Sequence, residues 1–212
     1  HSLGKYLIKV SPTNDKSTAI LTNIKAALDK NPSFDNVEID LSLTKITNIP
    51  KEMFTNTTNL GKITLPDTVT NIEESAFSGC YSLNSIRFPN NLENISEGAF
   101  SNCSGLTLII LSSGALTNIS KNAFYGSSSL VNLILPANIS NVCDTAFSNC
   151  SQLNNVEYLG TNTNISGSPF SNGSNPSNLY LPNVDTSKTN EFNTNCFLDK
   201  KDWKITKGHI PS

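Results

Sequence analysis

The sequence has few of the residues on which most enzyme chemistry depends. It holds two histidines, His1 and His209, both close to the ends of the chain. A general acid–base pair, a Ser-His-Asp triad or a Cys-His nucleophile is therefore not expected. The cysteines form no C-x-x-C motif, and Cys143 and Cys150 have no histidine beside them. We predict a protein without catalytic residues, metal or cofactor.

Long apolar runs and charged patches are also lacking. The longest apolar run extends only from Leu108 to Leu111, whereas a membrane-spanning helix needs about 20 residues. Fifteen Lys and Arg against 17 Asp and Glu leave a formal charge of −2 with no block of like charges, so nucleic acid is not an expected partner. The first residues form no charged and apolar leader, so we expect any signal or anchor to lie outside these 212 residues.

What the sequence does contain is a repeat. Six phenylalanines follow one another at intervals of 23, 23, 24, 23 and 23 residues. Apolar residues recur five positions before each phenylalanine and nine and eleven positions after it, usually with a leucine at six. The core L-x-x-I-x-L at this period is the signature of a leucine-rich repeat. The six phenylalanines are Phe54, Phe77, Phe100, Phe124, Phe147 and Phe170.

Each period predicts one coil of a solenoid. Within L-x-x-I-x-L the last two apolar residues are two apart, which places both on one face of a strand, and successive strands stack into a parallel sheet. The segment around each phenylalanine is too short for a free helix but suits one helical or 3₁₀ turn. We therefore predict an α/β solenoid, a right-handed leucine-rich-repeat stack with a concave parallel sheet, short helical turns on the convex side and terminal caps.

Three further columns belong to the architecture. Gly or Asn stands two residues after each phenylalanine, which predicts a positive φ. The next position holds cysteine, threonine, serine or glycine; stacked coils would bring Cys80 and Cys103 within bridging distance, but such a mixed column and an odd count of cysteines favour free thiols. Asparagine stands directly before the apolar residue that lies five positions ahead of each phenylalanine. These asparagines could form a stacked amide ladder or be solvated turn residues.

Both ends of the chain depart from the repeat, as expected because a solenoid must cover its apolar cross-sections. Residues 1–36, with a strand over 5–10 and an amphipathic helix over 18–30, form the predicted N-terminal cap. Residues 37–182 carry the repeats, and residues 183–212 are predicted to form a degenerate capping coil. In that coil the column positions are taken by Phe192, Cys196, Phe197 and Trp203, with Trp203 over the last layer.

The motif I-x-x-x-A-F-x-x-C-x-x-L-x-x-I-x-L-P is nearly intact from Ile72 to Pro89 and from Ile95 to Leu111. It resembles the BspA-like, or Treponema pallidum-type, leucine-rich repeat, and the segment before it is similar to leaders of spirochaete members. The resemblance implies a secreted, periplasmic or surface-attached bacterial protein, and some members of the family are adhesins for host proteins. The chain departs from the motif where Ser112 and Leu159 replace proline, and in the last coil Pro169 replaces alanine and Pro176 replaces leucine.

The residues between the core positions of each strand point outward from the concave sheet and define the candidate binding face. Most of them are polar, but three aliphatic side chains in adjacent strands predict one contiguous patch of roughly 200 to 400 Å², near the size that marks a site. The alternative is that these are ordinary strand formers, or that a loop covers them. The predicted partner-binding residues are Leu108, Ile110, Ile134, Tyr180, Arg87 and Glu157.

Together these features predict a non-enzymatic protein-interaction module of a bacterial cell surface or periplasm, with adhesion to a host protein as the use that the resemblance implies. Two alternatives stay open. The patch could mediate self-association within the cell envelope, or a pocket on this face could capture a lipid or another apolar small molecule.

Overall fold

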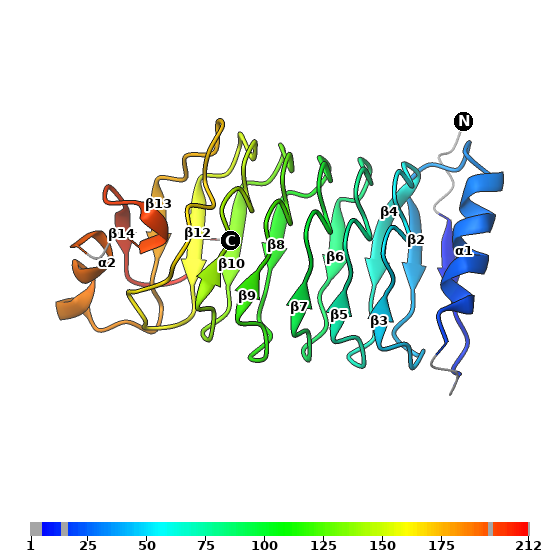
Figure 1. The fold of residues 1–212 in the computed structure, drawn as a ribbon, viewed down its shortest axis with the longest axis horizontal. Coiled ribbons are helices and arrows are strands. Elements are labelled where there is room, and N and C mark those ends of the chain that lie inside the picture. The colour runs from blue at the N-terminus through cyan, green and yellow to red at the C-terminus, as the bar shows by residue number, and fades with distance from the viewer. Residues whose placement is uncertain (1–5, 14–16, 195–196, 212) are drawn as a thin grey trace.

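The computed structural model describes residues 6–13, 17–194 and 197–211. They form an elongated, nearly straight stack of coils with helix α1 (Ala19–Lys30) at one end and the short helix α2 (Glu191–Thr194) at the other (Figure 1). Each coil contributes one longer strand to one side of the stack. This arrangement confirms the predicted leucine-rich-repeat solenoid.

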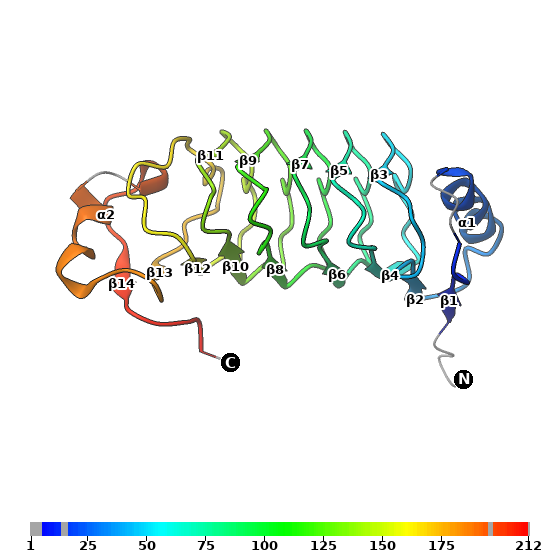
Figure 2. The same cartoon turned by 90° about the horizontal axis from the view of Figure 1, so that it is seen from below.

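The longer strands form the concave sheet, and every pairing between them is parallel. They divide into the sheet β1-β2-β4-β6 and the sheet β8-β10-β12-β13-β14, which adjoin in the stack between β6 and β8. Figure 2 shows all of them along one side of the molecule. The strands are β1 (Leu7–Lys9), β2 (Val37–Asp40), β4 (Leu60–Thr64), β6 (Ser85–Arg87), β8 (Leu108–Ile110), β10 (Asn132–Leu135), β12 (Asn155–Tyr158), β13 (Asn178–Tyr180) and β14 (Lys204–Thr206).

A second parallel sheet, in the order β11-β9-β7-β5-β3, lies on the opposite side of the stack (Figure 2). Its strands are the two-residue asparagine and isoleucine columns, for which the repeat predicted an amide ladder or turn residues but no sheet. The pairing slips in the last coil, where Asn141 bridges to Ser166 and not to the aligned Asn164. The strands are β3 (Asn48–Ile49), β5 (Asn71–Ile72), β7 (Asn94–Ile95), β9 (Asn118–Ile119) and β11 (Asn141–Val142).

The asparagine column forms a partial amide ladder. The amide of Asn94 donates to the side-chain oxygen of Asn71 at 2.7 Å, and Asn141 donates to Asn118 at 2.6 Å. Asn48 instead donates to the carboxylate of Glu73 at 2.7 Å. These bonds join side chains of neighbouring coils, so the column ties coils together.

The segments around the phenylalanines are turns, which corrects the expectation of helical or 3₁₀ turns there. A helix satisfies its own N–H groups, whereas here alternate N–H groups donate to the next coil, as from Phe54 to the Ala76 carbonyl at 2.7 Å and from Phe77 to the Ala99 carbonyl at 2.7 Å. Residues of positive φ two positions before and after the phenylalanine reverse the backbone and allow this pattern. The second residue after each phenylalanine has a positive φ, as predicted for the Gly or Asn column. These residues are Asn56, Gly79, Asn102, Gly126, Asn149 and Asn172.

The core follows the phenylalanine column. From Phe54 to Phe147 consecutive rings stack with centroids 5.0 to 5.3 Å apart and planes within 10° of parallel. The four described cysteines are free thiols, as predicted for Cys80 and Cys103. In the buried column each thiol donates to the carbonyl of the phenylalanine one coil back, for example from Cys80 to Phe54 at 3.1 Å.

The two ends of the stack bury apolar side chains that do not belong to the repeat. Helix α1 buries Leu21, Ile24 and Leu28 in the same core as the coils. At the other end, beyond the 3₁₀ helix η1 (Thr186–Lys188), α2 and the 3₁₀ helix η2 (Phe197–Asp199) precede β14. Of the residues assigned to the last coil, Cys196 lies outside the described residues, whereas Phe192, Phe197 and Trp203 are buried. Trp203 packs its edge against Phe170 at 6.0 Å, over the last phenylalanine of the column.

Candidate protein-binding face

The aliphatic patch of the concave sheet consists of Leu108 and Ile110 on β8 and Ile134 on β10. The register pairs Ile110 with Ile134, so the predicted row is confirmed. Leu108 and Ile110 are 41% and 46% exposed, and Ile134 is half-buried. The ordinary neighbours in the same strands, such as Ile109 and Leu133, are completely buried. The patch is therefore a set of outward side chains that no described loop or cap covers completely.

On one side of the patch the sheet carries charge. Arg87 on β6 is exposed, and its guanidinium lies 3.1 and 3.2 Å from the carboxylate oxygens of Asp67. It also donates to the carbonyl of Leu65 at 3.3 Å. The backbone N–H of Asn90 and then the Arg87 guanidinium hold the pKa of Asp67 below its usual range. Arg87 is thus an ordered charge at the edge of the patch.

On the other side an amide ladder crosses three strands of the concave sheet. Asn155 donates to the side-chain oxygen of Asn132 at 2.7 Å, and Asn178 donates to that of Asn155 at 2.8 Å. The three residues occupy paired positions on β10, β12 and β13. Because the donors and acceptors satisfy one another, this row is a fixed polar border beside the aliphatic side chains.

The structure places Glu157 differently from the prediction. It was expected as an exposed flanking charge, but the residue is only 2% exposed. The chain after β14 turns back beneath β13 and β12 on the concave side (Figures 1 and 2). There His209 Nδ1 lies 2.5 Å from one carboxylate oxygen of Glu157, and the backbone N–H of Ile210 donates to the other at 2.9 Å. Residues 207–211, here called the C-terminal segment, therefore cover this part of the face.

Tyr180, the sixth predicted residue, follows Glu157 in the same row and pairs with Thr206 on its other side. It is half-buried and lies farther from the aliphatic patch than Glu157 does. The structure thus brings Leu108, Ile110, Ile134 and Arg87 together on one open stretch of the sheet, and separates Tyr180 from them by the covered Glu157.

Sequence reasoning missed the C-terminal segment. It identified the last coil from Phe192, Phe197 and Trp203, but nothing in the repeat predicts a chain that crosses the strands after β14. The one available signal was His209, a lone histidine beside an isoleucine, four residues after the strand residue Ile205. Its partner Glu157 is 52 residues earlier in the chain, so no local pattern connects the two.

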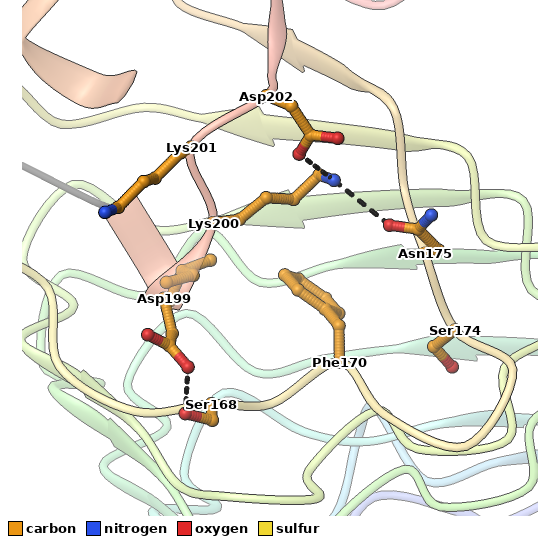
Figure 3. A pocket seen from close by; sticks show the side chains of 9 residues that line it. Ser168, Phe170, Ser174, Asn175, Asp199, Lys200, Lys201 and Asp202 are labelled. Atoms are coloured by element: carbon orange, nitrogen blue, oxygen red, sulfur yellow. Dashed lines mark hydrogen bonds and ion pairs between the residues drawn. The ribbon is translucent and has the colours of Figure 1, made fainter. Parts of the chain in front are cut away.

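Four cavities of about 250 to 350 Å³ lie away from the aliphatic patch. The one in Figure 3 lies between the last repeat and η2, where Lys200 donates to Asn175 at 3.0 Å and also pairs with Asp202. In the same cavity Ser168 donates to Asp199 at 2.7 Å. Charged and polar side chains dominate its lining, which does not favour an apolar ligand there.

Groups suited to chemistry are scarce in the structure. Burial raises the pKa of the Cys80 and Cys150 thiols to about 12, so neither is a ready nucleophile. Across the described ranges, no three His, Cys, Asp or Glu side chains gather closely enough to hold a metal ion. In the same residues no helix has the length and apolar character needed to cross a membrane.

Comparison with known proteins supports the repeat. The model of the BspA type leucine rich repeat region matches residues 22–115, 47–177 and 117–207. Among curated proteins, no sequence matches the chain. The solved structures that share the fold include the following two. A leucine rich cell surface protein from Faecalibacterium prausnitzii is 24% identical with a TM-score of 0.58, and the match covers 78% of this chain but 39% of that one. A leucine rich repeat protein from T. pallidum is 22% identical with a TM-score of 0.55, and the match covers 80% and 85% of the two chains.

Proposed function

The chain belongs to the BspA-type leucine-rich-repeat family, and from this premise we propose that it is a protein-interaction module of a bacterial surface, which binds its partner through the aliphatic patch. Stacked repeats of this kind form extended concave surfaces that serve in binding. The cell surface is proposed because the similar protein from F. prausnitzii is described as a cell surface protein. More specifically, we propose that the partner is a host protein and that the module serves in adhesion.

The observation that carries the proposal is the exposure of the adjoining Leu108 and Ile110 in the middle of the stack, where the sheet has polar residues on both sides of them; the other exposed aliphatic of these strands, Leu7, lies apart on the end strand β1. Exposed aliphatic side chains that adjoin each other lose unfavourable hydration when a partner covers them. Around them the ordered Arg87 and the asparagine row supply a polar border, as in the rims of protein interfaces. Because the strands are fixed by the stack, binding would order few groups, which limits its entropic cost.

The proposal is tested with Ile110→Asp, which places a charge at the centre of the patch. Thr64→Asp is the matched control, because Thr64 occupies the same outward row on β4, two coils away. Host-matrix and cell-envelope extracts would be passed over each immobilised variant, and the retained proteins identified by mass spectrometry. We expect wild type and Thr64→Asp to retain the same partner, and Ile110→Asp to retain at least tenfold less, with unchanged circular dichroism.

Full retention by a folded Ile110→Asp would contradict the proposal. Two other outcomes point to the alternative functions. A wild-type chain whose sedimentation shows a concentration-dependent oligomer, lost in Ile110→Asp, would indicate self-association through the patch. Copurification of an apolar small molecule, detected by native mass spectrometry, would indicate ligand capture.

A further inference from the structure

Glu157 is a buried carboxylate whose hydrogen bonds come from the C-terminal segment, outside the strands of the sheet. Its side chain is 3% exposed, and its two oxygens contact His209 Nδ1 and the Ile210 N–H. Its row neighbours on β10 and β13, Ile134 and Tyr180, are uncharged. A carboxylate removed from water without donors is strongly unfavourable, so whatever covers this position must supply hydrogen-bond donors, and a positive charge beside the carboxylate favours the covered state further.

The C-terminal segment itself has few other contacts to keep it there. The His209 side chain is 72% exposed, Lys207 and Pro211 are exposed, and Gly208 and Ile210 are only half-buried. None of these residues belongs to a strand, since β14 ends at Thr206. Segments with little buried apolar surface open at low free-energy cost. The C-terminal segment therefore covers Glu157 with little buried surface of its own, as expected for a segment that a peptide of similar chemistry displaces.

We propose that Glu157 is a receptor for an extended partner segment in which a cationic side chain precedes an aliphatic residue, and that the C-terminal segment occupies it as an intramolecular competitor. This inference rests on the proposed function, since it names the chemistry of the partner that docks on the same face. The His209–Ile210 pair shows the binding mode: the side chain contacts one carboxylate oxygen and the following backbone N–H donates to the other. The aliphatic patch begins with Ile134, the neighbour of Glu157 in the row.

Competition by a tethered segment has a measurable consequence. A segment attached through a short linker acts at an effective concentration of about millimolar order, so it weakens the apparent affinity for a free peptide of similar chemistry. Removing residues 207–212 leaves β14 intact and should expose the carboxylate. Ile210→Pro is a second variant, which removes the amide donor and keeps the chain length.

The probes are two fluorescein-labelled peptides, Lys-Gly-Arg-Ile-Pro-Ser and Lys-Gly-Gln-Ile-Pro-Ser, titrated by fluorescence anisotropy. We expect the chain lacking residues 207–212 to bind the arginine peptide at least tenfold more tightly than the glutamine peptide. The complete chain should bind the arginine peptide at least tenfold more weakly than the shortened one, with Ile210→Pro in between. In the shortened chain Glu157→Gln should remove the preference for arginine, whereas Glu97→Gln, an exposed carboxylate on the turn side, should keep it.

Equal binding of the two peptides by the shortened chain, or an arginine preference that survives Glu157→Gln, would overturn the inference. Circular dichroism and the melting temperature verify that each variant is folded; if the shortened chain unfolds, the comparison is made with Ile210→Pro against the complete chain. Failure here is distinguishable from failure of the proposed function, because Ile110→Asp tests the patch without touching Glu157. If Ile110→Asp loses the partner and neither peptide is preferred, the patch is supported as a binding site and Glu157 is excluded as a receptor.

Discussion

The regular coils and the C-terminal end of the stack solve the same packing problem in different ways. In the regular coils each phenylalanine stacks on the next at 5.0 to 5.3 Å. Between Phe147 and Phe170 the centroid distance grows to 6.1 Å and the planes tilt by 34°. Beyond it, Trp203 meets Phe170 and Phe197 edge-on, and Phe197 meets Phe192 edge-on but Tyr158 at a tilt of 37°. A repeated column thus gives one repeated contact, whereas the end is closed by large rings in individual orientations.

The last coil differs because its sequence removes what the column needs. Pro169 replaces the alanine and Gly173 replaces the small polar residue after the turn, and the asparagine bridge slips to Ser166. Phe170 is consequently half-buried, whereas the five phenylalanines before it are completely buried. A phenylalanine is completely buried in this stack where both of its neighbouring coils are regular, as expected for repeats that contact only their neighbours.

The largest effect should come from removing a ring in the regular coils. Phe100 lies between Phe77 and Phe124 and also contacts the edge of Phe88. We expect Phe100→Ala to lower the free energy of unfolding by about 3 to 5 kcal/mol, because it leaves a cavity bounded by rigid coils. Phe170→Ala should lower it by less than about 2 kcal/mol, because the ring is only half-buried. Urea denaturation with unchanged m-values measures both free energies. Equal losses would contradict the expected difference between the regular coils and the C-terminal end.

The thiols of the regular coils predict a second difference, in alkaline stability. Burial raises the pKa of Cys80 and Cys150 from 9.0 to about 12. A group whose folded pKa is raised contributes stability that is fully present below the unfolded pKa, so it is lost between pH 9 and about 12. The loss approaches about 1.4 kcal/mol per pH unit for each thiol. Cys150→Ala should flatten the dependence measured by urea denaturation from pH 8 to 11, and parallel curves for the variant and wild type would contradict the burial argument.

How much the sequence could predict follows the same division. The repeat predicted the concave sheet, the positive φ after each phenylalanine and the free thiols, because each depends on residues a fixed distance apart. It did not predict positive φ two residues before the phenylalanine, because only Gly98 and Asn122 in that column favour it, whereas Glu52, Ser75 and Thr145 do not. The non-helical turn follows from bonds between coils, which are not visible within one period.

The candidate site divides in the same way. The row formed by Ile110 and Ile134 follows from the register of the repeat, and the structure confirms it. The burial of Glu157 depends on a segment outside the repeat that returns across the strands, so a residue's place in a column could not reveal it. Repetition predicts where a side chain points, but only the three-dimensional path of the chain end shows what covers it.

The smallest expected effect concerns the mixed cysteine column. Cys103 donates to the Phe77 carbonyl at 3.1 Å, but in the part of the chain that the structure describes the buried hydroxyl of Ser127 finds no partner. The longer bonds of sulfur reach a carbonyl that the serine oxygen does not. At the irregular end Ser174, one position farther along, donates to the Phe147 carbonyl at 2.5 Å and accepts from the Cys150 N–H at 2.7 Å.

Ser127→Cys should therefore raise the free energy of unfolding by about 1 kcal/mol, because it replaces an unsatisfied buried hydroxyl by a bonded thiol. Cys103→Ser should lower it by a similar amount, and Ser174→Ala should also lower it, since Ser174 holds two partners at the irregular end. Midpoints of urea denaturation are sufficient to rank the three variants. A higher free energy of unfolding for Cys103→Ser would contradict this prediction. It would show that the thiol–carbonyl hydrogen bonds of the regular coils contribute nothing to stability.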